Sequence, residues 1–514
     1  MIAGAAGVSA WRVPQWRARG DRANCHNESF MNHEPDFLEN LRAELSGWRR
    51  WLDRAIVLGY AVAAGLFVVG FTIAAEWAFG LFERLHHAAP WAPLLWTPAV
   101  TAAIVWVTRR WFPGAAGSGI PQVKAALDPT LGAGQRGLFA SLRLTVAKIA
   151  LGVAGFAAGL SIGREGPSVQ VAAGVMQHAR RWLSPRSTID ARALLIAGGA
   201  AGIAAAFNAP LAGVVFAIEE LSGRLEARAS GVIITAIVLA GLVAVSVFGN
   251  LSYFGIIRVP PLGWALLGPG LGVALASGIA GGLFARLMIA SLTGSPQRLN
   301  HWRARWPVRF AAVGGLVVAL IGVVTGGITF GAGSESVKQM LAGHDELTPL
   351  YTLLKFIATW LTAWCGVPGG IFAPSLSIGA GIGDGIAQLA NPTLGPALIA
   401  MGMAGFLAAV TQAPLTAFII VMEMVDGHSM VLSLMASAML ASLVSRMISR
   451  PLYETLAEHM VARALEAQPP APAAGVKTTT TGTALDTAAA DARVPVTSRP
   501  SHAPSAGAAD ARSH

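Results

Sequence analysis

Glu165 is an ionisable residue that stands between a glycine- and proline-rich break and an apolar helix, within residues 163–170 (GREGPSVQ). Ionisable groups inside a membrane protein are costly and therefore indicate function. A carboxylate in desolvated surroundings takes up a proton more readily than one in water, so it can change protonation in the working pH range. We interpret Glu165 as a group that competes with an anion when it is charged. The alternative is an ion pair with Arg164 at a membrane surface.

Glu219 and Glu220 end the apolar run 211–220 (LAGVVFAIEE) and form a second acidic candidate. Ionisable groups at the end of an apolar segment of a membrane protein are candidates for a functional role. The residues leave a second interpretation open, in which both side chains mark a cytoplasmic helix end that faces water.

Two glycine-containing loops precede helices and are suited to holding a small anion. Residues 117–121 (GSGIP) combine flexible glycines with a serine hydroxyl, and residues 369–374 (GGIFAP) offer backbone amides before a helix. A helix N-terminus presents free N–H groups and about half a positive charge, so several such ends together hold an anion without a full cation. Either loop alone is an ordinary turn. The prediction depends on their joint occurrence.

These residues belong to a chain whose composition is that of a membrane protein. Of its 514 residues, 54% are hydrophobic and 12% are charged, and the mean hydropathy is +0.57; soluble domains have roughly 25% charged residues. Apolar stretches of about 20 residues, the length of a membrane-spanning helix, recur between Ala55 and Leu452. Runs such as 231–249 show no alternation of period two. The sequence therefore predicts an all-α polytopic membrane protein.

Many of the predicted helices must be short, tilted or broken. The chain has 59 glycines, and glycine and proline clusters interrupt the apolar segments. These clusters lie at 113–121, 163–167, 208–210, 366–374 and 412–414. Broken backbone at membrane depth is tolerated only where it faces protein or a polar pathway. We therefore expect the functional site at these breaks, which include both loops and Glu165.

An internal repeat relates two parts of the membrane body. Residues 198–219 align with residues 402–423 at an offset of 204, and the matches include Pro210 with Pro414. Paired interrupted segments in corresponding halves are the best sequence indication of a transporter's binding site. We therefore predict two related halves; the alignment leaves open whether they are inverted or parallel.

Three regions follow along the chain. We predict a polar cytoplasmic leader (1–50), a membrane domain (51–465) and a disordered cytoplasmic tail (466–514) that is rich in Ala, Pro, Thr and Ser. The halves of the membrane domain run over about 51–250 and 262–450. Arg49, Arg50 and Arg54 precede the first span and predict a cytoplasmic N-terminus. The net charge of +10 comes from arginines scattered over short loops, which excludes a nucleic-acid-binding face.

The motifs together resemble the CLC family of chloride channels and chloride/proton antiporters, in its bacterial form without nucleotide-binding regulatory domains. The motifs that carry this resemblance are GSGIP at 117, GREGP at 163, AAFNAPLAGVVFAIEE at 205–220, GGIFAP at 369 and PLY at 451–453. It covers roughly residues 50–460. It implies the CLC-type fold of two inverted repeats with tilted, broken helices, and a homodimer with one pore per subunit. It also implies a multi-pass protein of a bacterial-type inner (plasma) membrane, with both termini cytoplasmic.

The resemblance also assigns roles to residues of this chain. It implies that Ser118 and Tyr453 donate hydroxyls to chloride and that Ile371 and Phe372 donate backbone N–H groups. Glu165 then matches a gating glutamate, which occupies an anion position when deprotonated and swings away when protonated. Glu220 matches an internal proton-relay glutamate. The expected function is coupled chloride/proton antiport, with chloride, protons and the lipid bilayer as partners and no cofactor or metal.

Departures from the family pattern keep a second function in view. Gln122 and Lys124 stand where well-known bacterial exchangers carry acids, and we expect Lys124 near Lys148 and the internal proton route. These departures weaken the case for efficient proton coupling. The alternative function is therefore a passive gated chloride channel. A distant third possibility is a membrane serine hydrolase, because 159–163 (GLSIG) matches a nucleophile elbow around Ser161. The apolar helical context and the lack of a histidine within a span oppose it.

Overall fold

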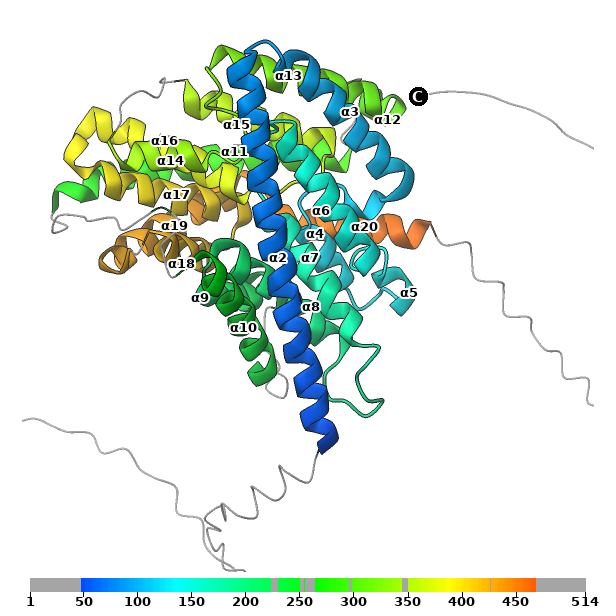
Figure 1. The fold of residues 1–514 in the computed structure, drawn as a ribbon. Coiled ribbons are helices and arrows are strands. Elements are labelled where there is room, and N and C mark those ends of the chain that lie inside the picture. The colour runs from blue at the N-terminus through cyan, green and yellow to red at the C-terminus, as the bar shows by residue number, and fades with distance from the viewer. Residues whose placement is uncertain are drawn as a thin grey trace, which may run out of the picture. The chain divides into compact units, whose positions relative to one another are not determined.

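The computed structural model describes residues 48–222, 230–249, 254, 264–294, 298–343, 350–425 and 427–467 (Figure 1). The predicted leader lies outside these residues except for 48–50, which open the first described helix. The predicted tail lies outside them except for its first two residues, Glu466 and Ala467. The described residues form helices and no β-sheet, with one isolated bridge between Gly163 and Gly370. The expected all-α class is therefore confirmed.

The helices fall into two series along the chain. The first consists of α2 (Trp48–Ala88), α3 (Pro93–Trp111), η1 (Pro113–Ala115), α4 (Ile120–Ala126), α5 (Ala133–Arg136), α6 (Leu142–Ala157), α7 (Glu165–Ala179), α8 (Ala191–Phe207), α9 (Pro210–Phe216), the π-helical segment η2 (Ala217–Ser222) and α10 (Ser230–Phe248). The second consists of η3 (Trp264–Leu266), α11 (Leu267–Thr293), α12 (Arg298–Arg305), α13 (Pro307–Val324), α14 (Ser334–Leu341), α15 (Tyr351–Cys365), α16 (Phe372–Ala390), η4 (Pro392–Leu394), α17 (Gly395–Thr411), α18 (Pro414–Met424), η5 (His428–Met430), α19 (Val431–Ile448) and α20 (Leu452–Glu466).

Six helices in the described part of the chain are long and apolar enough to cross a membrane. They are Trp48–Ala88, Gly231–Phe248, Trp264–Thr293, Pro307–Val324, Pro392–Thr411 and Val431–Ile448. Helix α2 has 41 residues, which corresponds to roughly 60 Å at 1.5 Å per residue, and in Figure 1 it runs past both series. Other apolar helices are shorter, with 15 residues in α7 and 11 in α18. The protein is a multi-pass membrane protein with short and interrupted helices, as the glycine and proline clusters predict.

The two series have matching elements at the offset found in the sequence. Helix α8 ends at Phe207 and α17 at Thr411, 204 positions later. Each helix is followed by a residue in the left-handed conformation, Asn208 (φ 56°) and Gln412 (φ 59°). These are the only non-glycine residues with positive φ in the described part. A proline two positions later then starts α9 or α18, because proline is well accommodated in the first turn of a helix.

The halves also contact each other through a reciprocal pair of glutamates. Glu219, in η2, accepts hydrogen bonds from two amides at the start of α18, at 3.0 and 2.6 Å. Glu423, in α18, accepts hydrogen bonds from two amides at the start of α9, at 3.2 and 2.7 Å. Carboxylates stabilise helix N-termini in this way. Glu219 is therefore a helix cap, which separates its role from that of the adjacent Glu220.

Helices α7, α8, α16 and α17 form the buried centre, with α7 beside α8 and α16 beside α17 (Figure 1). Glycines allow this close packing. A Cβ at Gly202 of α8 would lie 2.5 Å from the carbonyl oxygen of Ser168 in α7, which is closer than side-chain carbons approach. Because α7 and α16 are buried over nearly their whole first turns, their N-termini open inside the protein instead of at its surface.

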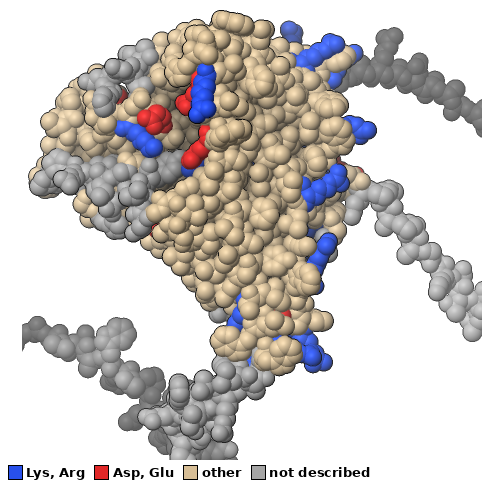
Figure 2. Space-filling view, in the orientation of Figure 1, with Lys and Arg blue, Asp and Glu red and all other residues tan. Residues whose placement is uncertain are grey.

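Charged side chains are distributed unevenly over the molecule. Figure 2 shows Lys and Arg along the right and lower edges, whereas most of the visible Asp and Glu lie at the upper left, together with some Lys and Arg, in the region of α14 and α16. We call the face on which α2 begins the arginine-rich face, because Arg49, Arg50 and Arg54 lie in its first turns. The opposite end of α2 lies at the acidic face, where Glu83 and Glu335 line a common hollow.

Candidate functional site

Three helix N-termini meet in the buried centre through backbone contacts between glycines. Gly163 and Gly370 exchange two hydrogen bonds, with N–O distances of 2.8 and 2.7 Å, and the Gly369 amide donates to the Gly117 carbonyl at 3.2 Å. These contacts join the loops before α7, α16 and α4. The joint occurrence on which the sequence prediction depended is therefore a direct spatial contact, and the positive ends of the helices face a common region.

Glycine is required where these loops approach most closely. A Cβ at Gly166 would collide with the Ser118 hydroxyl and would lie 2.9 Å from the Ser118 carbonyl oxygen. Gly119, before α4, has φ +116°, a conformation that other residues rarely adopt. The GSGIP and GREGP loops can therefore interlock only because both contain glycine at these positions, and this contact brings Ser118 to the start of α7.

The hydroxyls of Ser118 and Tyr453 lie near each other, although 335 positions separate them in the chain. Both oxygens are buried, and neither has a hydrogen-bond partner of standard geometry among the described residues. Ile371 is the N-cap of α16 and Phe372 is its first residue, and the Phe372 and Tyr453 rings lie 6.0 Å apart. The four residues predicted for chloride binding are therefore together. A buried hydroxyl without a partner is costly, and a ligand that accepts hydrogen bonds would satisfy it.

Two residues hold the loop that carries Ser118. The fully buried Lys148 of α6 donates to the carbonyl oxygens of Ala115 and Gly117, at 2.8 and 2.5 Å. Gln122 accepts a hydrogen bond from the Gly119 amide at 2.9 Å and donates to the Ala116 carbonyl. Gln122 therefore braces the loop. Lys148 forms no ion pair with a described carboxylate, and its hydrogen bonds shown here go to backbone carbonyls of this loop.

Glu165 is the first residue of α7, and only 2% of it is exposed. Its carboxylate accepts a hydrogen bond from the Ala373 amide of α16 at 3.4 Å, and further ones from the amides of Arg164 and Glu165. The side chain thus folds onto the N-termini of α7 and α16. These backbone donors are of the kind that binds small anions, so the carboxylate occupies a position suited to an anion.

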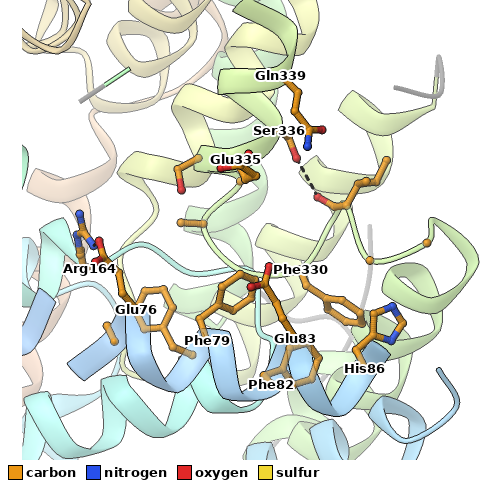
Figure 3. Close-up of a pocket in the computed structure, with 18 of the residues that line it drawn as sticks. Glu76, Phe79, Phe82, Glu83, His86, Arg164, Phe330, Glu335, Ser336 and Gln339 are labelled. Carbon is orange, nitrogen blue, oxygen red and sulfur yellow. Dashed lines mark hydrogen bonds and ion pairs between the residues drawn. The ribbon is translucent and has the colours of Figure 1, made fainter. Parts of the chain in front are cut away.

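A hollow of about 290 Å³ leads to Glu165 from the acidic face (Figure 3). Glu76, Glu83 and Glu335 line it together with His86. The guanidinium of Arg164, which precedes Glu165, donates to the Glu76 carboxylate at 2.5 Å. The sequence alternative joined Arg164 to Glu165. The structure shows Arg164 paired with Glu76 of α2 and the Glu165 carboxylate hydrogen-bonded to backbone.

A second hollow, of about 320 Å³, leads to Ser118, Ile371 and Tyr453. Arg303 and Arg463 also line it, and they supply positive charge. Because Glu165 lines one hollow and Ser118 and Tyr453 line the other, the three helix N-termini separate two cavities. An anion at this place would lie between the two cavities, and the Glu165 side chain lies on the side of the first hollow.

Glu220 lies in the π-helical segment η2 and pairs with Lys124 of α4, with an Nζ–Oε1 distance of 2.8 Å. The side chains are 8% and 20% exposed, so the pair is largely shielded from water. Tyr453 lies within electrostatic range of both Glu220 and Glu165. Sequence reasoning placed Lys124 near Lys148. The structure pairs Lys124 with Glu220, and Lys148 holds the Ser118 loop.

Sequence reasoning did not assign a function to Lys148, although the repeat contains a signal for it. Lys148 and Lys355 are 207 positions apart, which is also the offset of Pro167 and Pro374. Lys355 is fully buried as well, and it donates to carbonyls of the loop before α14. Each half thus uses a buried lysine to hold a loop before a short helix. Glu76 has a different signal, because it is an acidic residue within an apolar stretch, but the sequence does not identify Arg164 as its partner.

The serine hydrolase alternative finds no support at Ser161. Its hydroxyl forms a hydrogen bond with the Thr359 hydroxyl at 2.8 Å, and Thr359 in turn donates to the Lys355 carbonyl. A nucleophilic serine needs a histidine or another base in this position. Ser161 is thus part of the packing between α15 and the segment before α7.

Comparisons with known proteins match this chain to a sequence family, to a named relative and to solved structures. The sequence model of the family described as "voltage gated chloride channel" matches residues 99–446. The H(+)/Cl(−) exchange transporter ClcA of Citrobacter koseri is 30% identical over 452 residues, which are 81% of this chain and 92% of the relative. A slow cyanobacterial Cl−/H+ antiporter of known structure is similar with a TM-score of 0.66 and 25% identity, over 80% of this chain and 98% of that chain. A CLC-type fluoride/proton antiporter has the same fold, with a TM-score of 0.64 and 21% identity over 79% and 97% of the two chains.

Proposed function

Because the chain belongs to the voltage-gated chloride channel family, we propose that it exchanges chloride for protons across a membrane. It is a transporter and not an enzyme. The relative from Citrobacter koseri is named as an H(+)/Cl(−) exchanger and the cyanobacterial structure as a Cl−/H+ antiporter, and both support this function. The observation that carries the proposal is the Glu165 carboxylate, which lies on the amides of two helix N-termini.

The mechanism depends on competition between Glu165 and chloride. Two negative charges 4 Å apart repel by about 4 kcal/mol at an effective dielectric constant of 20, so the carboxylate and chloride cannot share these amides. When Glu165 takes up a proton, its side chain becomes a poor ligand for the amides and leaves them to chloride. Chloride then accepts from the Ser118 and Tyr453 hydroxyls and from the amides of Ile371 and Phe372. Loss of the proton to the acidic face returns the carboxylate and expels the anion.

The inner proton reaches Glu165 by way of Glu220. Glu220 lies near Tyr453, and Tyr453 in turn lies near Glu165, which supports a route along the chloride site. Lys124 holds Glu220 in an ion pair. For each transport cycle Glu220 must therefore leave this pair, at least briefly, to accept a proton.

The same ion pair favours one alternative, a passive gated chloride channel. If Lys124 keeps Glu220 charged throughout, no proton reaches Glu165 from the arginine-rich face. Glu165 then gates chloride from the acidic face alone, and protons are not carried in proportion to chloride. The two functions differ in whether a chloride gradient can drive protons.

Reconstituted liposomes with chloride high inside and the membrane voltage clamped distinguish them. In an exchanger, chloride efflux drives protons inward, so the external medium becomes alkaline while chloride appears outside. In a channel, chloride appears outside without a pH change. Vesicles without protein give the leak rate. We expect alkalinisation, and chloride efflux without it would replace the exchange proposal by the channel.

We also propose the topology and assembly that the family resemblance implies. The arginine-rich face is cytoplasmic, which Arg49, Arg50 and Arg54 in the first turns of α2 support. The halves, about 51–250 and 262–450, are inverted repeats. The reciprocal contacts of Glu219 and Glu423 support a two-fold relation, because residue i meeting j while j meets i is the signature of such an axis. Two copies form a homodimer with one pore each. Sedimentation of the purified protein in detergent measures the mass of the assembly and so tests the dimer.

Removing the Tyr453 hydroxyl is expected to weaken chloride binding without unfolding the protein. A hydrogen bond to a charged group contributes about 1.5–3 kcal/mol, so Tyr453→Phe should raise the chloride dissociation constant roughly ten- to hundredfold, as measured by calorimetric titration. Tyr351→Phe is the matched control, because its buried hydroxyl pairs with Ser377 in α16. Equal binding by Tyr453→Phe and the native protein would remove Tyr453 from the chloride site.

A further inference from the structure

A hollow of about 660 Å³ on the protein surface contains four arginines and is not part of the chloride route. It lies where α5, the start of α6 and the end of α7 meet. Its polar lining consists of Arg136, Ser141, Arg143, Gln177, His178, Arg180 and Arg181. The described carboxylates form no ion pair with any of these four arginines. Four like charges around one hollow repel each other, and an anion inside it would relieve that repulsion.

Buried polar atoms in this hollow also lack partners. Nε of Arg136 and Nε2 of His178 are buried without a hydrogen-bond partner among the described residues, and so is Oε1 of Gln177. Buried polar groups normally have partners. Arg136, Gln177 and His178 therefore have hydrogen-bonding capacity that the described residues do not use. Arginine is particularly suited to phosphate because its planar donors bind two oxygens at once.

The hollow lies at the arginine-rich face, at the level of a membrane surface. Ser184, which follows α7, donates to the Asp53 carboxylate from its amide and its hydroxyl, at 2.9 and 2.7 Å. This contact fixes the end of α7 beside the first turns of α2. Trp182, 67% exposed, lies between them, and tryptophan favours the membrane–water interface.

A separate apolar groove lies further along α6, one of the helices that line the hollow. It has a volume of about 510 Å³ and lies between α2 and α6. It is lined by Leu66, Phe67, Gly70, Phe71, Val146, Ile149 and Ala150. Arg143, Val146 and Ala150 follow one face of α6 at helical spacing. Ala150 is seven residues beyond Arg143, about 10 Å along the axis, so the groove begins below the charged side chains, at the depth of acyl chains.

We propose that the arginine hollow and the groove together bind one anionic phospholipid, with its phosphate among the arginines and an acyl chain between α2 and α6. Positive charge on a cytoplasmic face alone would follow from topology, but it explains neither the buried unpaired donors nor the adjoining groove. A free phosphate would use the hollow only. The site requires that the chain lies in a bilayer and is independent of chloride exchange.

Native mass spectrometry of the purified full-length protein tests the site. After removal of lipid, the protein is incubated with phosphatidylglycerol or phosphatidylcholine of the same chain length. We expect phosphatidylglycerol to be retained about tenfold more strongly, and Arg136→Gln/Arg180→Gln to abolish this preference, since arginines near a membrane surface attract anionic lipid. Arg298→Gln/Arg305→Gln, in α12, removes the same charge elsewhere and should leave the preference intact.

Gly70→Phe tests the groove separately. A Cβ at Gly70 has no neighbour within 4 Å, so the larger side chain fits and fills the groove. We expect retention of phosphatidylglycerol to fall at least about fivefold, because the acyl chain loses its contact area.

Equal retention of the two lipids by the native protein, or an equal loss in the α12 control, would overturn the proposal. Displacement of phosphatidylglycerol by inorganic phosphate, with Gly70→Phe unchanged, would also overturn it, in favour of a phosphate site. If the double arginine variant does not fold, Gly70→Phe and Arg143→Gln still decide the question.

Discussion

Glu165→Gln is expected to abolish proton transport and to leave chloride transport intact. Glutamine resembles a protonated carboxyl group in shape and charge, so it neither carries a proton nor repels chloride from the amides of α7 and α16. In liposomes with a chloride gradient, external alkalinisation should fall to the leak level while chloride efflux persists. Efflux should also lose its dependence on external pH, because no group at this position titrates.

Glu83→Gln is the matched control for Glu165→Gln. Glu83 lines the same hollow on the acidic face but contacts none of the amides that hold the Glu165 carboxylate. The control should retain both fluxes. Undiminished proton transport in Glu165→Gln would show that the gate is elsewhere, whereas loss of both fluxes in Glu83→Gln would show that the hollow itself is required.

Glu220→Gln is expected to preserve chloride transport and to uncouple it from protons. The amide still accepts a hydrogen bond from Lys124, so the contact between η2 and α4 survives, but no proton can be relayed.

Lys124→Gln is expected to have the opposite effect, because Glu220 keeps its carboxyl group and is released from the ion pair. Proton flux per chloride should be equal to or higher than in the native protein. Parallel chloride and pH recordings give both ratios.

Glu454→Gln separates the role of Glu220 from that of a neighbouring charge. Glu454, at the start of α20, lies within electrostatic range of Glu220 and is exposed. The Glu454→Gln protein should still couple chloride transport to proton transport. Persistent coupling in Glu220→Gln would move the relay to another group. Loss of coupling in Lys124→Gln would make the ammonium itself a part of the proton route.

The membrane body and its interrupted helices could be predicted because they depend on local properties of the chain. Apolar stretches of spanning length, and glycine or proline at the breaks, favour the same helices in any context. The sequence likewise predicted breaks at 208–210 and 412–414, and the helices before them end at Phe207 and Thr411. The ends of those helices could be predicted from the local sequence, without information on the helices that pack against them.

The motif residues of the site could also be identified from the sequence, but their contacts could not. The chain of glycines that joins Gly163 to Gly370, and Gly369 to Gly117, links segments that are remote in sequence. Each motif by itself is compatible with an ordinary turn. Only their mutual contact creates a region where three helix N-termini, two hydroxyls and a carboxylate face one another.

The charged pairs were decided by the tertiary structure alone. Lys124 meets Glu220 across 96 positions, and Arg164 meets Glu76 across 88. No periodicity along the chain encodes such distances, because the partners come from different helices whose packing depends on shape complementarity. By itself the sequence determined a membrane protein with broken helices and an acidic, glycine-rich set of candidates. The fold decided which carboxylate rests on backbone amides and which pairs with a cation, since electrostatic interactions weaken steeply with separation and solvent exposure.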